Sequence, residues 1–183
     1  PEGLLSVPLD GGKVRRHVLG ILRKHFKTRE VYPVHRIDRG TSGVMIFART
    51  ERAMRVLMGM FKDHDFTRKY IAVVQGRVSG SCGTWESYLM EVNDYEVKTT
   101  PDADRGKKAI THYVVTRRTK NFSYLDLTIE TGRKHQIRVH CQEAGHPIVG
   151  DKRYGSSSSP ISRMCLHAAF LEFRHPTTRK KMS

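Results

Sequence analysis

A short polar segment around Asp38 concentrates side chains that could do chemistry. Residues 35–43 read His-Arg-Ile-Asp-Arg-Gly-Thr-Ser-Gly, and a short apolar run follows at 44–48. Functional groups are commonly presented on a loop that a rigid element holds in place. Asp38 stands between two arginines, which favour its charged form, and an ionised carboxylate can act as nucleophile, base or electrostatic stabiliser. The alternative is a turn aspartate that bonds its own backbone.

A second cluster covers residues 131–140, which read Thr-Gly-Arg-Lys-His-Gln-Ile-Arg-Val-His. A helix from Lys134 to Ala144 would place Arg138 one turn beyond Lys134 on the same face. Its end near Gly132 would offer backbone N–H groups and the positive end of the helix dipole to an anion such as phosphate. The alternative is a basic helix face exposed to water.

Several other kinds of site are excluded by spacing. The ten histidines and three cysteines invite a metal, but no C-x-x-C, H-E-x-x-H or similar pair occurs, so no metal site is expected. No phosphate-binding loop or dinucleotide fingerprint occurs either, so no nucleotide or other cofactor is expected. A serine-hydrolase elbow requires G-x-S-x-G, whereas Gly43 follows Ser42 directly.

The charge balance points to a polyanionic partner. The chain has 33 Lys and Arg against 18 Asp and Glu, a net charge of +15. Residues 1–50 carry ten basic and four acidic side chains, and residues 131–183 carry ten and three. Nucleic acid is the usual partner of such an excess, and an anionic membrane surface is the less common one.

Length and cysteine content bound the protein class. A chain of 183 residues is expected to form one domain, residues 1–183, with a sizeable core. Three widely spaced cysteines do not form a disulfide framework, so a reducing, cytoplasmic location is expected. No apolar run approaches the roughly 20 residues of a membrane-spanning helix, so no membrane partner is expected.

The elements that position these clusters can be predicted from hydrophobic periodicity. Helices are predicted at 13–26, at 51–62 and at 134–144; Thr50 caps the second, with Met54, Leu57, Met58 and Phe61 inward, and Gly145 ends the third. The fold class is α+β, with a mixed, mainly antiparallel central sheet and flanking helices. Strands are predicted at 44–48, 69–75, 109–117, 124–130 and 166–174, with turns at 76–83 and 155–160.

Six segments together resemble the RluA family of RNA pseudouridine synthases. HRIDRGTSGVMIFART at 35–50 is similar to the family's catalytic motif, and PEGLLSVP at 1–8 is similar to a segment near the family's N-terminus. The resemblance continues in order along the chain, in RKYIAVVQG at 68–76, ETGRKHQIRVH at 130–140, AGHPIVGDKRYG at 144–155 and CLHAAFLEFRHP at 165–176.

The resemblance implies an RNA-binding catalytic cleft and the isomerisation of uridine to pseudouridine in ribosomal or transfer RNA, without metal or cofactor. It places the catalytic carboxylate on Asp38, the motif tyrosine on Tyr70 and the arginine that pairs with the carboxylate on Arg138. The remaining residues expected to bind RNA are Arg36, Arg39, Thr41, Arg133, Lys134 and His135.

The family pattern also sets expectations about the ends and the assembly. The family's N-terminal segment begins with a Lys before the position of Pro1, and a further strand commonly follows the final His-Pro, so a catalytic domain shortened at both ends is expected. A monomer is the default expectation.

Two other functions remain open on the sequence. A non-catalytic RNA-binding module with the same fold would explain the charge, but such a module has no chemical reason to retain Asp38, Tyr70 and Arg138. A basic structural protein, such as a ribosome-associated factor, would explain the net charge without explaining the Asp38 segment. For Tyr70 alone, the alternative is a core tyrosine of a strand.

Overall fold

The computed structural model describes residues 3–7, 16–157 and 159–183. The chain divides into two compact units, unit 1 with Pro1–Thr67 and Phe170–Ser183, and unit 2 with Arg68–Ala169. Two long strands, β4 and β9, run from one unit into the other along the chain. Among the described residues, no helix is long and apolar enough to cross a membrane.

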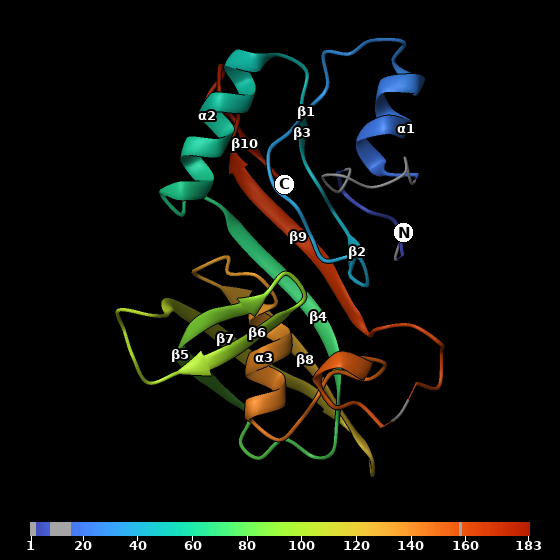
Figure 1. Ribbon diagram of the computed structural model, residues 1–183, viewed down its shortest axis with the longest axis vertical. Helices are drawn as coiled ribbons and strands as arrows, with labels where there is room; N and C mark the ends of the chain where they lie inside the picture. The colour runs from blue at the N-terminus through green and yellow to red at the C-terminus, as the bar shows by residue number, and fades with distance from the viewer. Residues whose placement is uncertain (1–2, 8–15, 158) are drawn as a thin grey trace. The chain divides into compact units, whose positions relative to one another are not determined.

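Unit 1 combines two helices with short strands (Figure 1). Within it, β1 and β3 pair antiparallel, and β10 pairs with the end of β9. A core of apolar residues includes Leu57 and Met60 of α2, Phe66 just before β4 and Leu171 of β9. The elements of unit 1 are α1 (Val18–His25), β1 (Tyr32–Pro33), β2 (Ser42–Gly43), β3 (Phe47–Ala48), α2 (Glu51–Lys62) and β10 (Lys181–Met182).

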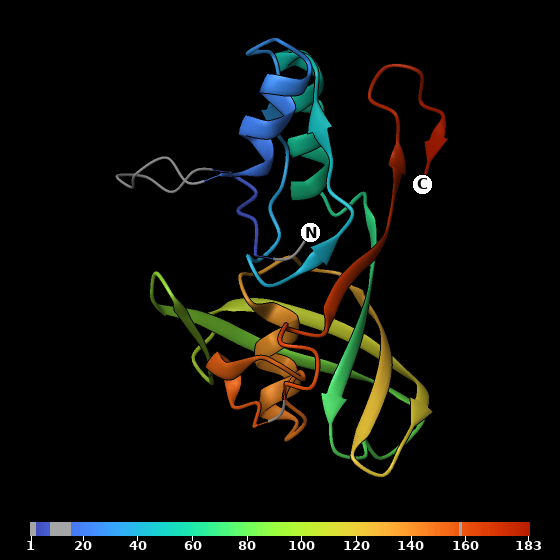
Figure 2. The ribbon, with the colours of Figure 1, turned by 90° about the vertical axis from the view of Figure 1, so that its right-hand side faces the viewer.

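Unit 2 is built on a sheet in the order β9, β4, β8, β7, β5, β6. The pairs β4–β8, β8–β7, β7–β5 and β5–β6 are all antiparallel, and Figure 2 shows β4 and β8 side by side. The elements that occupy unit 2 or enter it are β4 (Thr67–Gln75), β5 (Cys82–Asn93), β6 (Glu96–Thr100), β7 (Lys107–Arg118), β8 (Phe122–Ile129), α3 (Gln136–Glu143), η1 (Lys152–Tyr154) and β9 (Leu166–Arg174).

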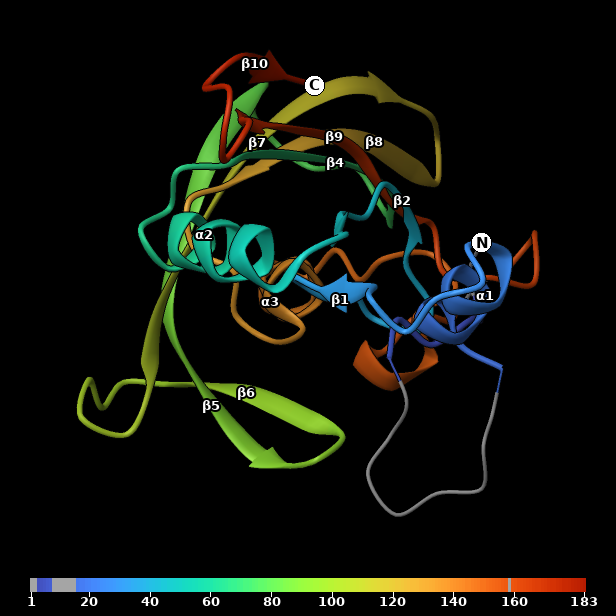
Figure 3. The same cartoon turned by 90° about the horizontal axis from the view of Figure 1, so that it is seen from above.

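Helix α3 covers one face of this sheet. Leu125, Leu127 and Ile129 alternate along β8 with less buried residues, as a half-exposed strand requires, and they pack with Ile137 and Cys141 of α3. A second cluster joins β5, β6 and β7 to α3 and η1. The hairpin of β5 and β6 is seen from above in Figure 3. The sheet face under α3 is therefore the core of unit 2.

Several predicted elements are confirmed. Helix α2 spans the predicted 51–62, and the Thr50 hydroxyl accepts a hydrogen bond from the Ala53 N–H at 3.2 Å, as an N-cap residue does. The predicted strand at 166–174 is β9, and the one at 69–75 lies within β4. Gly145 follows the end of α3 with φ +78°, a conformation that favours glycine. The mixed, mainly antiparallel fold class is thus confirmed.

Other predictions were wrong in detail. The buried strand predicted at 44–48 reduces to Phe47–Ala48, because Val44 is exposed and the Ile46 N–H donates to the His35 ring instead of to a strand. The first helix begins at Val18, and the predicted positions 13–15 lie outside the described residues. Met58, expected inward, is 50% exposed, and Met60 takes the buried position.

The sequence reading missed the hairpin of β5 and β6. Its strands carry charged and polar residues at most outward positions, and the inward positions of β5 include Ser87 as well as Trp85 and Leu89. The apolar alternation is therefore interrupted. The Asn93-Asp94 pair between Val-containing runs is the turn signal that could have revealed it.

Candidate active site

Asp38 lies on a loop of unit 1 that the rest of the unit holds from several sides. The Thr41 N–H donates to the Asp38 carbonyl at 2.9 Å, which closes a turn. The Ser6 hydroxyl donates to the Ile37 carbonyl at 3.2 Å and accepts from the Ile37 N–H. The His35 ring accepts the Ile46 N–H at 3.0 Å and stacks on Phe61. The loop backbone next to Asp38 is thus fixed, as presentation of a reactive carboxylate requires.

The neighbours of Asp38 in the chain divide into exposed and buried residues. Arg36 and Arg39 are exposed, and Thr41 is buried. The Arg39 Nε donates to the Gly3 carbonyl at 3.1 Å, and the Gly3 N–H donates back to the Arg39 carbonyl at 2.6 Å. Arg39 therefore ties the N-terminal segment to the Asp38 loop in addition to any contact with a ligand.

Tyr70 lies on β4 in unit 2, on the sheet face that carries α3. It is half-buried and packs against the cluster that contains Ala72, Leu127 and Ile137. Arg68 shares this face two residues earlier, and its Nη2 donates to the Glu130 carbonyl at 2.9 Å. Burial lowers the pKa of Arg68, and the nearby Tyr70 opposes that shift. The phenol therefore lies close enough to a guanidinium to interact with it electrostatically.

Arg138 is buried on the first turns of α3 and forms a two-point ion pair with Asp151. Its Nε donates to Asp151 Oδ2 at 2.6 Å, and its Nη2 donates to Oδ1 at 2.9 Å. The guanidinium carbon also lies 4.8 Å from the centre of the Tyr154 ring. A guanidinium held by both edge and face has one orientation, because its planar fork matches a carboxylate only in that geometry.

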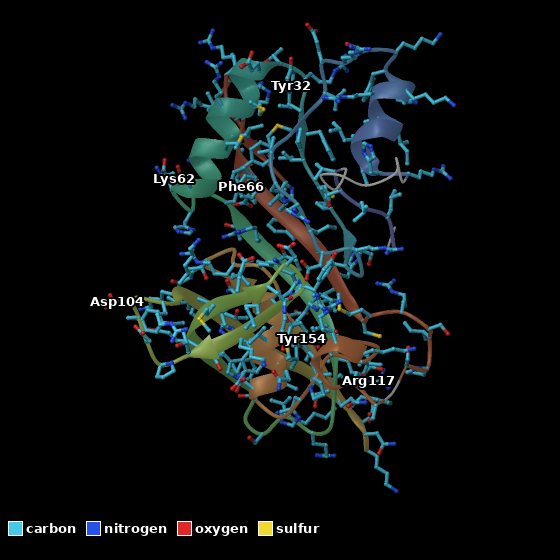
Figure 4. The ribbon with its side chains drawn as sticks, viewed as in Figure 1. Tyr32, Lys62, Phe66, Asp104, Arg117 and Tyr154 are labelled. Carbon is cyan, nitrogen blue, oxygen red and sulfur yellow. The ribbon has the colours of Figure 1, made fainter. Side chains whose placement is uncertain are left out.

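Tyr154 is itself fixed by hydrogen bonds at its hydroxyl. The hydroxyl lies 2.7 Å from His135 Nδ1, and it accepts the Val97 N–H at 3.1 Å. Tyr154 is labelled in Figure 4 in unit 2 near α3. The fixed ring supports the Arg138 guanidinium, so Asp151, Tyr154 and Arg138 form a connected group that we call the arginine clamp.

The three basic residues before α3 have partners within unit 2. Arg133 Nε donates to the Lys108 carbonyl at 2.9 Å, and Lys134 Nζ pairs with Glu91 Oε2 at 2.7 Å. The Lys134 hydrogen bond lowers the pKa of Glu91. His135 has a left-handed φ of +55° and contacts Tyr154. All three therefore contribute to the structure of the segment that leads into the helix.

The predicted start of the third helix was wrong. Helix α3 begins at Gln136, so Lys134 does not share a helix face with Arg138. The reason is local, since His135 adopts a left-handed conformation and the Gln136 side-chain oxygen accepts the Arg133 N–H at 3.0 Å. A left-handed residue cannot be part of a right-handed helix, so α3 begins at the residue after His135.

Buried polar residues fix α3 to the sheet, and the sequence reading assigned them no role. Gln136 Nε2 donates to the Ile110 carbonyl at 2.9 Å, and its Oε1 accepts from the Thr131 hydroxyl at 2.8 Å. His140 bonds the Thr111 hydroxyl through Nδ1 and the Ser87 hydroxyl through Nε2. Burial lowers the pKa of His140 to about 4, so its ring is neutral near pH 7.

The predicted catalytic residues fall in both units. Asp38 belongs to unit 1, and Tyr70 and Arg138 belong to unit 2, where both lie on the α3 side of the sheet. Asp151 and Tyr154 were missed as functional candidates. Their signal was the segment at 144–155, which carries a carboxylate and an aromatic residue between two glycines.

The comparisons with known proteins decide the family. A family model described as RNA pseudouridylate synthase matches residues 1–143. The chain belongs to this family. Asp38, Tyr70 and Arg138 all lie within the matched residues, and members of the family isomerise uridine to pseudouridine in RNA.

Individual relatives agree with this family. The dual-specificity RNA pseudouridine synthase RluA of Haemophilus ducreyi is 35% identical over 189 residues, covering 100% of this chain and 84% of that protein. The uncharacterized RNA pseudouridine synthase YjbO of Bacillus subtilis is 40% identical over 152 residues, and the match spans 83% of this chain but only 53% of that protein. The chain thus spans about half the length of some relatives.

A solved structure has the same fold. Human RNA pseudouridylate synthase domain containing 1 superposes with a TM-score of 0.80 at 25% identity, covering 98% of this chain and 81% of that one. The α+β arrangement described above is therefore the fold of a pseudouridine synthase.

Proposed function

We propose that this chain isomerises uridine to pseudouridine at chosen positions of ribosomal or transfer RNA, with Asp38 as the catalytic carboxylate. The observation that carries the proposal is the position of Asp38 on a loop fixed by Ser6 and His35, within the residues that match the family. The wider family provides the reaction, and the net charge of +15 fits an RNA substrate.

The reaction requires a reactive group close to the ribose and the base. The bond between uracil N1 and ribose C1′ breaks, the uracil turns, and C5 joins C1′, while C5 loses a proton and N1 gains one. No atom is added or removed overall. Because the target base is stacked or paired, it must first leave the RNA stack and enter a pocket. Asp38 then acts by attack at C1′, by attack on the ring or by proton removal at C2′.

Two further side chains complete the proposed chemistry. Tyr70 lies against the uracil through its ring, and its hydroxyl assists the proton step at C5. Arg138 is proposed as the basic residue that keeps the catalytic carboxylate ionised, the role that the family resemblance implies for it. Asp151 accepts from two of the five N–H donors of the guanidinium, and a guanidinium can bond a second carboxylate through other donors.

RNA contacts are proposed on each of the two units. Arg36 fills the gap left by the flipped base or grips a phosphate, for which its exposed planar guanidinium is suited. Arg39 is exposed and contacts RNA beside Asp38. Thr41, also expected to contact RNA, is buried and instead closes the turn that presents Asp38. Lys134 exchanges Glu91 for an RNA phosphate at low energetic cost, since a surface ion pair contributes at most about 1 kcal/mol.

The central test replaces Asp38 with asparagine. We expect Asp38→Asn to abolish pseudouridine formation and to leave RNA affinity within a few-fold, because the amide keeps the shape but loses the charge. Product is measured by chemical labelling and mass analysis of the RNA, beside a binding assay. The control is Asp126→Asn, which removes an exposed carboxylate from β8. Normal turnover by Asp38→Asn would overturn the assignment and favour another carboxylate.

The proposal extends to the target and the setting. We place the protein in the cytoplasm as a monomer, where ribosomal and transfer RNA are available to it. Pseudouridine maps of total RNA with and without the gene identify the target uridine. A map without any change would contradict the proposed activity, and sedimentation of the purified protein tests the monomer.

A further inference from the structure

The Asp151 carboxylate bonds a distant side chain and not the helix that follows it in the chain. It is the residue before the short helix η1, a position where an aspartate ordinarily caps the helix with its own carboxylate. Within the described residues, that carboxylate makes no capping bond to η1. Both of its oxygens bond Arg138 instead, and only 2% of the Asp151 side chain is exposed. The Asp151 carboxylate therefore bonds Arg138, which is distant in the sequence, and does not cap η1.

The segment around Asp151 is built to keep the carboxylate in place. Its own backbone carbonyl accepts from the N–H groups of Tyr154 and Ser156 at 3.2 and 3.0 Å. Gly150 has φ +81°, and a Cβ there would overlap the Arg163 carbonyl. The Ser156 hydroxyl accepts the Gly150 N–H at 3.0 Å. The carboxylate therefore sits on a backbone with little freedom to move.

We infer that Asp151 is a positioning residue for the isomerisation, which sets the direction and plane of the Arg138 guanidinium, with Tyr154 supporting the guanidinium from its face. The inference rests on the proposed role of Arg138. It follows from geometry, since two parallel hydrogen bonds fix both the direction and the plane of a guanidinium and the ring beneath limits its tilt. Asp151 does not touch the substrate.

The buried ion pair between Arg138 and Asp151 is not well explained by a contribution to the stability of the fold. A buried ion pair contributes little net stability, because desolvation of two charges offsets their attraction. An apolar pair would fill the same space at similar stability. The presence of a carboxylate and a guanidinium joined by two hydrogen bonds is therefore better explained by the orientation that these bonds impose on the guanidinium.

The test is a double-mutant cycle on the rate of pseudouridine formation. We expect Asp151→Asn to lower kcat by about 10- to 100-fold, as loss of a residue that orients a functional group does, while KM and RNA affinity change little. Asp151→Glu, which keeps the charge, should recover part of kcat. In an Arg138→Met background, Asp151→Asn should cause no further loss, because the residue it orients is gone.

A matched variant separates positioning from loss of stability. Ser87→Ala removes the hydrogen bond to His140 on the same helix without touching the clamp. Its thermal midpoint should fall, yet its kcat at a temperature where the protein is folded should stay within about two-fold of the unchanged enzyme. Tyr154→Phe keeps the ring but removes the hydroxyl held by His135 and Val97, and should lower kcat less than Asp151→Asn.

The outcomes distinguish the two proposals. If Arg138→Met leaves kcat unchanged, the proposed role of Arg138 fails. If Arg138→Met lowers kcat but Asp151→Asn does not, or if the two losses multiply in the double variant, Asp151 has a purely structural role and the inference is overturned. If Asp151→Asn does not fold, the kcat values of Asp151→Glu and Tyr154→Phe are compared instead, each with and without Arg138→Met.

Discussion

Three of the arginines described above differ in how they are held. Arg138 is fixed by the Asp151 carboxylate, Arg133 by the Lys108 carbonyl and Arg39 by the Gly3 carbonyl. Arg138 makes two hydrogen bonds to an ionised acceptor, whereas the other two each donate from one nitrogen to a carbonyl, so of these three only Arg138 has a fixed plane. A lysine at position 138 could not reproduce that fork, because an ammonium group is a point charge.

At the residue scale, the hydroxyl of Tyr70 should separate chemistry from binding. Tyr70→Phe keeps the ring that is proposed to lie against the flipped base and removes the hydroxyl that is proposed to assist the proton step. We expect kcat to fall by about 10²- to 10⁴-fold, the usual contribution of general acid–base catalysis, with RNA affinity retained. Single-turnover assays measure this. Tyr124→Phe on β8 is the control, and an unchanged rate for Tyr70→Phe would limit Tyr70 to stacking.

At the scale of elements, α3 carries the arginine clamp on one side and a buried polar network on the other. Gln136 and His140 join the helix to β7 and β5 by hydrogen bonds that replace an apolar contact. Such a network specifies one position of the helix, because each buried polar atom has a partner only in that position. Burial also raises the pKa of Cys141 on the same helix, which makes its thiol inert.

The neutral His140 makes the stability of the fold depend on pH. Its pKa of about 4 in the folded state lies below the usual 6.5, so its contribution is complete above pH 6.5 and is lost as the pH falls toward 4. Between pH 7.5 and pH 5 this group should cost about 2 kcal/mol of unfolding free energy. Urea unfolding at both pH values measures the change.

The comparison that isolates this residue uses His140→Gln. Other histidines and carboxylates titrate over the same range, so the informative quantity is the difference between the unchanged protein and the variant. We expect a smaller loss of stability on acidification for His140→Gln. An equal loss in both proteins would show that His140 is not held neutral in the fold.

The loop before η1 depends on a glycine. Gly150→Ala should destabilise the protein by about 3 kcal/mol or more, because a left-handed φ and an overlap with the Arg163 backbone act together. The thermal midpoint measures the loss. Gly145→Ala is the control, since Gly145 also has a positive φ but a Cβ there has open space. Equal losses in both variants would mean that backbone strain alone accounts for the effect.

At the scale of the whole molecule, both units carry a positive excess. Unit 1 has 17 basic and 8 acidic residues, and unit 2 has 16 and 10. The basic N-terminal stretch, residues 1–50, belongs entirely to unit 1, whereas the basic C-terminal stretch is divided between the two units. The positive charge of either unit therefore attracts the phosphates of an RNA.

RNA affinity should fall steeply with salt. Each phosphate contact releases condensed counterions, so an interface with several contacts loses about 10³-fold or more in affinity between 50 and 200 mM salt. Filter binding or fluorescence anisotropy over that range measures the slope. The Asp38→Asn variant should show the same slope as the unchanged protein. A response independent of salt would contradict a phosphate-based interface.

Local patterns predicted well the elements whose periodicity is strong. The helix at 51–62 has a capping threonine and an apolar stripe, and β8 alternates strictly, so neighbouring residues alone determine both. The strand predicted at 44–48 is shorter than expected because the Ile46 N–H donates to the ring of His35, which lies eleven residues away in the sequence. The predicted start of α3 was wrong because the local backbone adopts another conformation, in which the Gln136 side-chain oxygen accepts the Arg133 N–H.

By itself, the sequence determined the family and the basic character, and it indicated Asp38, Tyr70 and Arg138 as candidate catalytic residues, because motifs and charge are properties of chain order and composition. Only the tertiary structure decided that Arg138 bonds Asp151 above the Tyr154 ring and that Lys134 pairs with Glu91. These pairs join residues 13 to 43 positions apart, and their meeting depends on strand register and helix packing, which no local pattern encodes.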